Sequence, residues 1–369
     1  MTASWSATAS ERNDAIAQAG RWRTVRPLDG GGPEFTMADG TEVVSFASND
    51  YLGLSQHPAV RAAAAEAIAR FGTGSGSARL IVGDRPVHDE LEADLAEWKG
   101  ADTALLFTTG YTANLGVIST LGTADVLIVS DELNHASIID GCRMARAQVA
   151  VARHRDTEHV RALLARHRGP AIVATDTVFS MDGDRADLEG LSVVCAEAGA
   201  LLVLDDAHAV LDAAWNPPAH LELLRVGTLS KTLGALGGFV AGARPFIDLL
   251  RNAARSFIFT TGSSPADTAA ALAALRIVRS PEGAALTARL RNNVDRVLAG
   301  HPSPIIPVMI GDERAALDAS SRLLDEHRLL VPAIRPPTVA PGTSRLRIAV
   351  SAAHSDDHLE RLLKALAAI

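Results

Sequence analysis

The sequence predicts an α/β protein, with a large domain built on a mostly parallel sheet and a small α+β domain at the C-terminal end. Three observations support this class. Short unbroken apolar runs alternate with helical segments, as they do when strands are buried on both faces of a parallel sheet. The chain of 369 residues is long enough for one large domain and a smaller one. Seven prolines between positions 302 and 341 mark a compositionally distinct C-terminal part.

We divide the chain into three parts. Residues 1–48 are expected to form an N-terminal arm, irregular except for a helix near residues 10–23, with a loop at the glycine run 30–32. Residues 49–265 form the large domain. Residues 266–369 form the small domain, which begins with alanine- and leucine-rich helices and ends with a helix over residues 356–368.

The large domain begins with helices and continues with strands. Helices are expected over residues 59–71 and 87–98, where helix-forming residues dominate. The predicted strands are the apolar runs 104–107, 126–129, 171–174, 201–204, 225–228 and 238–241. Ligands of such sheets bind beyond the carboxyl ends of the strands. The polar residues that follow these runs are therefore the candidate site.

Composition excludes several classes of protein. The formal net charge of −8 argues against a nucleic-acid partner. Cys142 and Cys195 have no metal-type spacing, which indicates free thiols in a reducing cytoplasm. We find neither a signal-peptide core nor an apolar run of the ~20 residues that a membrane helix needs. We expect a cytoplasmic protein with no membrane segment and no metal site.

Lys231 is the central candidate residue. It follows an apolar run, stands between hydroxyl residues in the segment 228–232, and precedes the glycine cluster of Gly234, Gly237 and Gly238. Asp205 ends the preceding apolar run. A pyridoxal phosphate enzyme needs a lysine that forms an imine with the cofactor and a carboxylate that keeps the pyridine nitrogen protonated. The alternative is a surface lysine that follows a strand and has no catalytic role.

Asp205 and His208 have two interpretations. They could be metal ligands, although a hydrolytic metal site normally requires a third protein ligand and His-rich spacing. As a cofactor pair, Asp205 would face the pyridine nitrogen, and His208, one helical turn later, would reach the ring hydroxyl. The adjacent Asp206 is then expected to support the site or to face solvent.

Two further segments are candidates for cofactor contacts. Thr109, Gly110 and Tyr111 close a strand and open a helix, so free backbone N–H groups would point at a bound phosphate; a simple strand-to-helix turn is the alternative. His135 follows the next run and could stack on a cofactor ring, or it could be structural. The glycine-rich segment 72–76 follows a helix and lacks the Gly-Lys-Ser/Thr ending of a P-loop.

Together these motifs resemble the α-oxoamine synthases, a family of fold-type-I pyridoxal phosphate-dependent transferases. The resemblance extends through the segments 49–54, 72–83, 134–137, 178–184, 227–232 and 345–347. It implies a large domain with a seven-stranded, mostly parallel sheet. The segment 211–218 departs from the family pattern because it is short and lacks glycine.

The resemblance also implies roles for individual residues. Lys231 would carry the cofactor, Asp205 and His208 would hold its ring, and His135 would stack above it. The other residues that it places around the cofactor are Gly110, Tyr111, Ser180 and Thr228. Arg347 would bind a substrate carboxylate, and Arg335, Thr338 and either Arg23 or Arg26 would contact the substrate. Thr260 would reach the phosphate of a neighbouring subunit, which implies a homodimer with shared active sites.

The implied reaction is an acyl transfer. The segment 333–339 resembles the biotin-pathway members of the family more than those that use other amino acids. We therefore expect a condensation of L-alanine with a pimeloyl thioester, on CoA or an acyl carrier protein, with release of CO₂ and free thiol. The alternative is a sibling that uses glycine or serine with another acyl-CoA.

Overall fold

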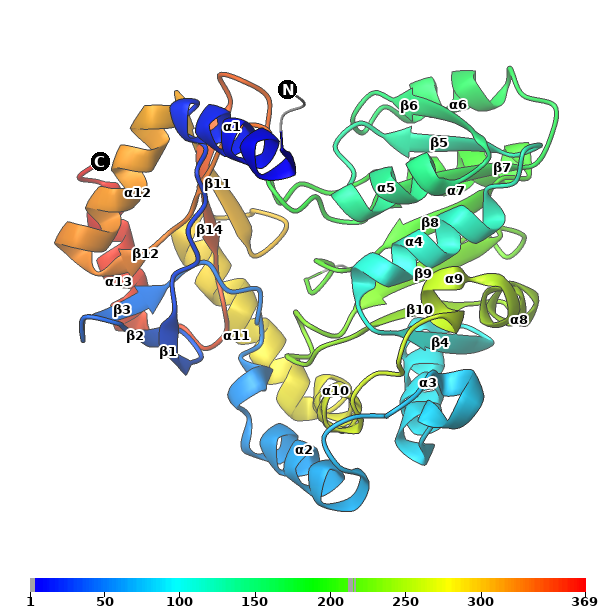
Figure 1. Cartoon of the computed structure of the whole chain (residues 1–369), viewed down its shortest axis with the longest axis horizontal. Coiled ribbons are helices and arrows are strands. Elements are labelled where there is room, and N and C mark those ends of the chain that lie inside the picture. Colours follow the sequence, from blue (N-terminus) through cyan, green and yellow to red (C-terminus); the bar gives the residue numbers. More distant parts are fainter. Residues whose placement is uncertain (1–3, 212–214, 216) are drawn as a thin grey trace.

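The computed structural model describes residues 4–211, 215 and 217–369. The segment 211–218, which departs from the family pattern, therefore lies partly outside the described residues. Figure 1 shows a larger body around one sheet and a smaller body around two sheets, with the long helix α11 (Pro281–Val297) between them. The predicted α/β class with a smaller C-terminal part is confirmed.

The sheet of the larger body has seven strands. They are β4 (Thr103–Phe107), β5 (Leu127–Asp131), β6 (Gln148–Ala152), β7 (Ala171–Asp176), β8 (Leu201–Asp205), β9 (Leu223–Thr228) and β10 (Gly238–Gly242). Their order is β4-β10-β9-β8-β7-β5-β6. The strand β10 runs antiparallel to both of its neighbours, and the remaining pairs are parallel. The predicted mostly parallel sheet is therefore confirmed.

The strand β6 is the one that hydrophobicity did not reveal. It lies at the edge of the sheet, where Val149 and Val151 are 40% and 60% exposed. Its place comes from parallel pairing with β5 and not from burial. The other strands coincide with the six predicted apolar runs, because their side chains are buried on both faces of the sheet.

Helices cover both faces of this sheet. One face packs on α4 (Gly110–Leu121), α5 (Ala136–Met144), α8 (Arg244–Ala253) and α9 (Arg255–Ile258). The other face packs on α6 (Thr157–Leu164) and α7 (Leu188–Ala198) at one end, and on α3 (Pro86–Lys99) and α10 (Pro265–Val278) at the other. The alternation is visible in β4, where Leu105 and Phe107 join the first core and Leu106 joins the opposite one. Helix α2 (Pro58–Phe71) packs on α10 (Figure 1).

The smaller body combines the two ends of the chain. One sheet contains β1 (Leu28–Gly31), β2 (Glu34–Met37), β3 (Glu42–Ser45) and β12 (Leu329–Leu330), and the other contains β11 (Ile305–Gly311), β14 (Ser344–Ala349) and β13 (Ala333–Ile334). Helices α12 (Glu313–His327) and α13 (Asp356–Leu366) complete it. Because β3 pairs in parallel with β12, the N-terminal strands belong to the same layer as the C-terminal part.

The expectation of an irregular N-terminal segment was wrong for residues 28–45. Gly30 and Gly31 lie in β1, not in a loop. Gly30 has a φ of +121°, a backbone conformation that favours glycine, and a Cβ there would lie 3.0 Å from the Glu34 carbonyl oxygen. The first helix, α1 (Trp5–Gln18), begins before residue 10 and ends before residue 23, the two bounds of the predicted helix.

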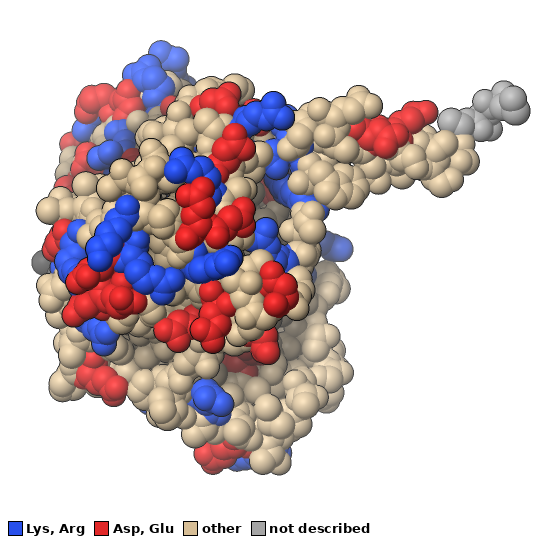
Figure 2. Space-filling view, turned by 90° about the vertical axis from the view of Figure 1, so that its left-hand side faces the viewer, with Lys and Arg blue, Asp and Glu red and all other residues tan. Residues whose placement is uncertain are grey.

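Helix α1 stands apart from the rest of the molecule. None of its residues is buried. Figure 2 shows the N-terminal segment projecting from a face on which acidic and basic side chains are interspersed. Among the helices of the described residues, none is long and apolar enough to cross a membrane.

His154 fixes the loop that contains Ser180. Its Nδ1 lies 3.0 Å from Asp131 Oδ1 at the end of β5, and its Nε2 lies 2.8 Å from Asp184 Oδ2. Asp184 belongs to the turn closed by the bridge between Val178 and Arg185. Partial burial would lower the pKa of His154, but hydrogen bonds to the two carboxylates outweigh it and raise this pKa to about 9.

We predict a pH-dependent loss of stability for His154→Asn. A raised folded-state pKa stabilises the protein fully below the ordinary pKa of histidine, 6.5, and this contribution is lost as pH rises through about 9. The variant should therefore lose about 2 kcal/mol of unfolding free energy near pH 6 and much less near pH 10, measured by urea denaturation. The control is His167→Asn, which removes an imidazole whose Nε2 contacts the Pro170 carbonyl. An equal loss of unfolding free energy at both pH values in His154→Asn would contradict a stabilising charge on His154 between Asp131 and Asp184.

Candidate active site

The carboxyl ends of the central strands bring two buried acids together. Asp176 ends β7 and Asp205 ends β8, and the two residues face each other in the parallel register. Both side chains are buried. Burial raises the pKa of Asp176 well above its usual range, and the neighbouring Asp205 raises it further. Asp176 is therefore the member of the pair whose protonated form is favoured.

Hydrogen bonds hold Asp205 in place. Its Oδ2 accepts a 2.6 Å hydrogen bond from Asn114 Nδ2, and its Oδ1 accepts a 2.9 Å bond from the backbone N–H of Ala207. Asn114 reaches this position from α4, which packs over β8 and β9. Both oxygens of the Asp205 side chain therefore act as hydrogen-bond acceptors.

Lys231 lies beside His208. Its Nζ is 2.9 Å from His208 Nε2, and His208 Nδ1 is 2.6 Å from the hydroxyl of Tyr51. Burial lowers the pKa of the Lys231 amine in spite of the nearby Asp205 and Asp176. Burial and the charge of Lys231 hold the pKa of His208 well below its usual range. The imidazole of His208 thus contacts an amine whose pKa is lowered by burial.

The segment predicted to bind a phosphate lies at the start of α4. Thr109 is the N-cap, and its Oγ1 accepts from the Thr112 N–H at 3.1 Å. The first N–H groups of a helix have no partner within the helix and point outward with the positive end of its dipole. A Cβ at Gly238 would lie 2.3 Å from the Thr109 carbonyl carbon, so glycine there lets β10 approach this turn. Gly110 lies against Thr228, where a Cβ would meet the threonine Cβ at 3.1 Å.

His135 is the N-cap of α5, at the edge of the same site. Its backbone N–H donates to Asp176 Oδ2 at 2.7 Å, and its ring Nδ1 is 2.7 Å from Ser137 Oγ. Burial lowers the pKa of His135, and the charge of Lys231 contributes to this. Tyr111 approaches the ring edge-on, with 6.3 Å between ring centroids, and its hydroxyl bonds Asp140.

Asp206 is buried, and the expectation that it could face solvent was wrong. Its Oδ2 contacts Lys99 Nζ at 2.8 Å and Arg225 Nη1 at 2.7 Å, and its Oδ1 accepts from the Thr177 hydroxyl. Burial alone would raise its pKa, but the two cations hold the pKa of Asp206 at about 2. Lys99 and Arg225 thus neutralise the charge of Asp206, which is next to Asp205 in the sequence, and this cluster supports the site.

Arg347 connects the smaller body to the site. It lies buried in β14, and its Nε donates to the Ser180 carbonyl. Its Nη2 donates to Asn49 Oδ1 at 3.1 Å, and the Tyr51 hydroxyl also reaches that oxygen at 3.1 Å. A single hydrogen-bonded path therefore joins Lys231 to Arg347 through His208, Tyr51 and Asn49.

The structure does not bring every predicted residue to Lys231. Arg23 and Arg26 are exposed on the segment that follows α1. Arg335 Nη1 donates to the Gly20 carbonyl, so the segment of Thr338 lies beside this arm. Thr260 is half-buried between α9 and α10.

Three residues of the cluster were not among the predicted site residues. Asp176 had a recognisable signal, because it ends a strand adjacent to that of Asp205. Tyr51 had none within its own segment, since it lies 157 residues from its partner His208. Asn114 sits inside a helix, and only the fold reveals that its amide meets Asp205.

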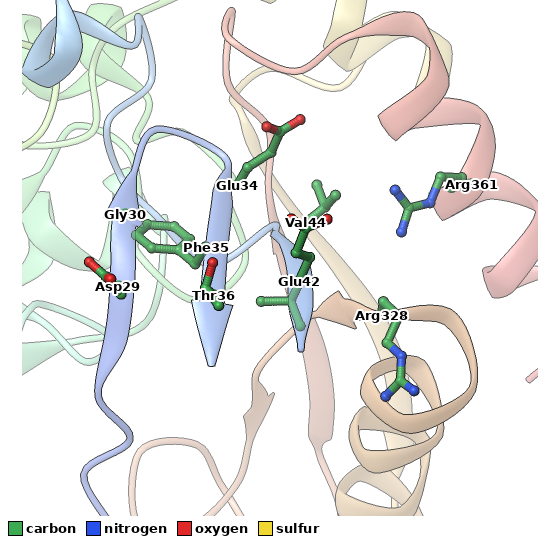
Figure 3. A pocket seen from close by; sticks show the side chains of 10 residues that line it. Asp29, Gly30, Glu34, Phe35, Thr36, Glu42, Val44, Arg328 and Arg361 are labelled. Atoms are coloured by element: carbon green, nitrogen blue, oxygen red, sulfur yellow. The ribbon is translucent and has the colours of Figure 1, made fainter. Parts of the chain in front are cut away.

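A separate cavity of about 350 Å³ lies in the smaller body (Figure 3). Side chains from β2 and β3 form one wall, and Arg328 and Arg361 form the other. No predicted site residue is among the described residues that line it.

Comparisons with known proteins show the family of this chain. The family model of class I and II aminotransferases matches residues 41–366. The 8-amino-7-oxononanoate synthase of Anaeromyxobacter dehalogenans is 46% identical, covering 96% of this chain and 94% of that protein. The enzyme of the same name from Methylorubrum extorquens is 48% identical, covering 91% of this chain and 88% of that protein. A serine palmitoyltransferase from S. paucimobilis, solved with a bound PLP–myriocin aldimine, superposes with a TM-score of 0.90 at 28% identity, covering 98% and 96% of the two chains.

These relatives share most of their length with the chain, and the serine palmitoyltransferase was solved with pyridoxal phosphate bound as an aldimine. The chain therefore belongs to the α-oxoamine synthases of the class I and II aminotransferase family, pyridoxal phosphate-dependent transferases, in the group that contains the 8-amino-7-oxononanoate synthases.

Proposed function

We propose that the chain condenses L-alanine with a pimeloyl thioester and releases 8-amino-7-oxononanoate, CO₂ and free thiol, as a step of biotin synthesis. The observation that carries the proposal is the Lys231 amine, held 2.9 Å from a neutral His208 next to two buried acids. The choice of alanine and a pimeloyl group rests on the names of relatives that are 46–48% identical. The acyl carrier is CoA or a carrier protein.

The residues of this site fit pyridoxal phosphate. Asp205 offers a carboxylate for the pyridine nitrogen, and His208, three residues later and beside Lys231, is placed for the ring hydroxyl. The α4 N-terminus at Gly110 and Tyr111, with the Thr109 and Thr228 side chains beside it, offers donors for a phosphate. When bound, the cofactor supplies an electron sink that lets a bond at the amino acid Cα break and leave its electrons in the ring.

Lys231 serves in this proposal as the residue that moves the α-proton. Burial lowers the pKa of this amine, which makes its unprotonated form, the one that accepts a proton from the alanine Cα, easier to reach. His208 lies 2.9 Å away and orients the amine. His135 would stack over the cofactor ring, and its Nε2–H would donate to the carbonyl oxygen that forms during condensation.

Arg347 is the proposed site for the alanine carboxylate. A planar guanidinium binds a carboxylate through two parallel hydrogen bonds. Ser180 and Asn49 hold this guanidinium in place through Nε and Nη2. Arg335, Thr338 and one of Arg23 and Arg26 form a second group for the acyl substrate, because the Arg335 contact with Gly20 joins their segments.

The alternative is a sibling enzyme that joins glycine or serine to another acyl group. The fold similarity to a serine palmitoyltransferase supports this alternative. The two reactions share the same chemistry at Lys231 and differ only in the substrates.

A second copy of the chain completes the assembly in this proposal. Helix α1 has no buried residue, and Leu80, Ile81, Val82 and Phe259 are 50–73% exposed. Apolar surface of this kind is typical of an interface. Thr260 follows Phe259 and would reach the partner's phosphate, and we propose the cytoplasm as the location of this homodimer.

Borohydride trapping tests the role of Lys231. The chain has only three lysines, Lys99, Lys231 and Lys364. Reduction of the loaded enzyme should attach a pyridoxyl group to the peptide that contains Lys231, measured by mass spectrometry. Lys231→Ala should lose this label and reduce turnover by about 10³-fold or more. Lys364→Ala, which removes an exposed lysine, is the control. A label on another lysine would refute the assignment.

Substrate specificity is tested by a matched set of incubations. Pimeloyl-CoA with alanine should yield free thiol and a new amino ketone by mass, while glycine and serine should yield far less. Deuterium exchange at the amino acid Cα, without acyl donor, ranks the three amino acids independently. Faster exchange and thiol release with serine or glycine would select the sibling reaction.

Arg347→Ala should raise the KM for alanine by about 10- to 100-fold, because it removes a charge-assisted hydrogen-bond donor from the carboxylate. The control is Arg345→Ala, which removes a buried arginine of the same strand that pairs with Asp182. The control should change this KM by less than about threefold. Equal KM values in the two variants would remove Arg347 from the substrate site.

A further inference from the structure

A continuous hydrogen-bond chain connects Asp205 with His135. Asn114 Nδ2 lies 2.6 Å from Asp205 Oδ2 and 2.9 Å from Ser137 Oγ. Ser137 Oγ in turn lies 2.7 Å from His135 Nδ1. Asn114 is 1% exposed and Ser137 is fully buried, so solvent does not compete for these groups.

The ionised end of the chain sets the direction of every bond. A carboxylate only accepts hydrogen bonds, so the amide nitrogen of Asn114, and not its oxygen, must face Asp205. The second N–H of this amide is then directed at Ser137 Oγ, which acts as acceptor. The Asn114 Oδ1 atom is buried without a partner among the described residues. The reverse orientation would set this oxygen against the carboxylate at 2.6 Å.

The remaining proton of Ser137 has one destination. Because Oγ accepts from Asn114, its hydroxyl is free to donate to His135 Nδ1. The backbone N–H of Ser137 also points at Nδ1, at 3.2 Å, and a backbone N–H can only donate. Two donors thus converge on one ring nitrogen, which must present its lone pair.

We propose that Asn114 and Ser137 are positioning residues that fix the neutral tautomer of His135, with the proton on Nε2 and the lone pair on Nδ1. Asp205 has two roles in this arrangement. It faces the proposed pyridine nitrogen, and through Asn114 it determines which nitrogen of His135 donates. The histidine therefore offers Nε2–H to an oxygen acceptor such as the developing carbonyl of the substrate. The tautomer does not depend on the proposed reaction, whereas this catalytic consequence rests on it.

Other charged groups around the ring do not compete for Nδ1. Asp176 accepts from the backbone N–H of His135, not from the ring. Asp140 bonds the Tyr111 hydroxyl and Arg143. Lys231 bonds His208 Nε2. The hydroxyl and the backbone N–H of Ser137 are thus the donors that the structure directs at Nδ1.

The test is ¹⁵N NMR of the full-length enzyme labelled in its histidine rings, with the His135 signals assigned by their loss in His135→Gln. In the wild type, Nδ1 should have the shift of an unprotonated ring nitrogen and Nε2 that of a protonated one at neutral pH. A proton on Nδ1 would overturn the proposal. This readout needs no substrate, so it stands or falls separately from the proposed reaction.

Variants add a second readout. Ser137→Ala should shift the tautomer ratio about fivefold toward Nδ1–H, the effect of losing one hydrogen bond, and should lower kcat by a similar factor with little change in the KM for alanine. Ser137→Thr keeps the hydroxyl and should restore both. Ser192→Ala, which removes a buried serine whose hydroxyl bonds the Glu189 carbonyl, should leave the His135 spectrum unchanged. An unchanged His135 spectrum and an unchanged kcat in Ser137→Ala would contradict the proposed positioning role of Ser137.

Discussion

The ionised carboxylate of Asp205, buried at the end of β8, is the interaction on which the organisation of the site depends. A buried charge is costly unless it is hydrogen-bonded or paired. Asn114 and the Ala207 N–H satisfy Asp205 directly, and its neighbour Asp176 is driven toward the neutral form. Behind it, Lys99 and Arg225 neutralise Asp206. Each of these contacts follows from placing negative charge at the end of a fully buried parallel strand.

The same constraint sets the chemistry of the neighbouring bases. Low solvent access lowers the pKa of Lys231, His208 and His135 together, so all three nitrogen bases near this carboxylate are shifted toward their neutral forms. Neutral bases can accept or relay protons at neutral pH, which charged ones cannot. The smaller body contributes Arg347 to this group through its contacts with Ser180 and Asn49. The site therefore depends on both ends of the chain as well as on the central sheet.

Much of the fold was predictable because burial on both faces leaves a continuous apolar run in the sequence. The edge strand β6 and the strands β1 to β3 were not, since their places come from backbone pairing with β5 and β12. Lys231, Asp205, His208 and His135 could be singled out because polar residues at strand ends gather at one sheet edge. Tyr51 and Asn114 are defined by the partners that they touch, and hydrogen bonds across 157 and 91 residues leave no local pattern. Asp176 ends the strand next to that of Asp205 and follows the same strand-end rule.

The most direct test of the central claim is a crystal structure of the enzyme with pyridoxal phosphate. The account predicts continuous density between the Lys231 amine and the aldehyde carbon of the cofactor, with the pyridine nitrogen within hydrogen-bond distance of Asp205. A cofactor seated elsewhere, or a ring nitrogen turned away from Asp205, would contradict it.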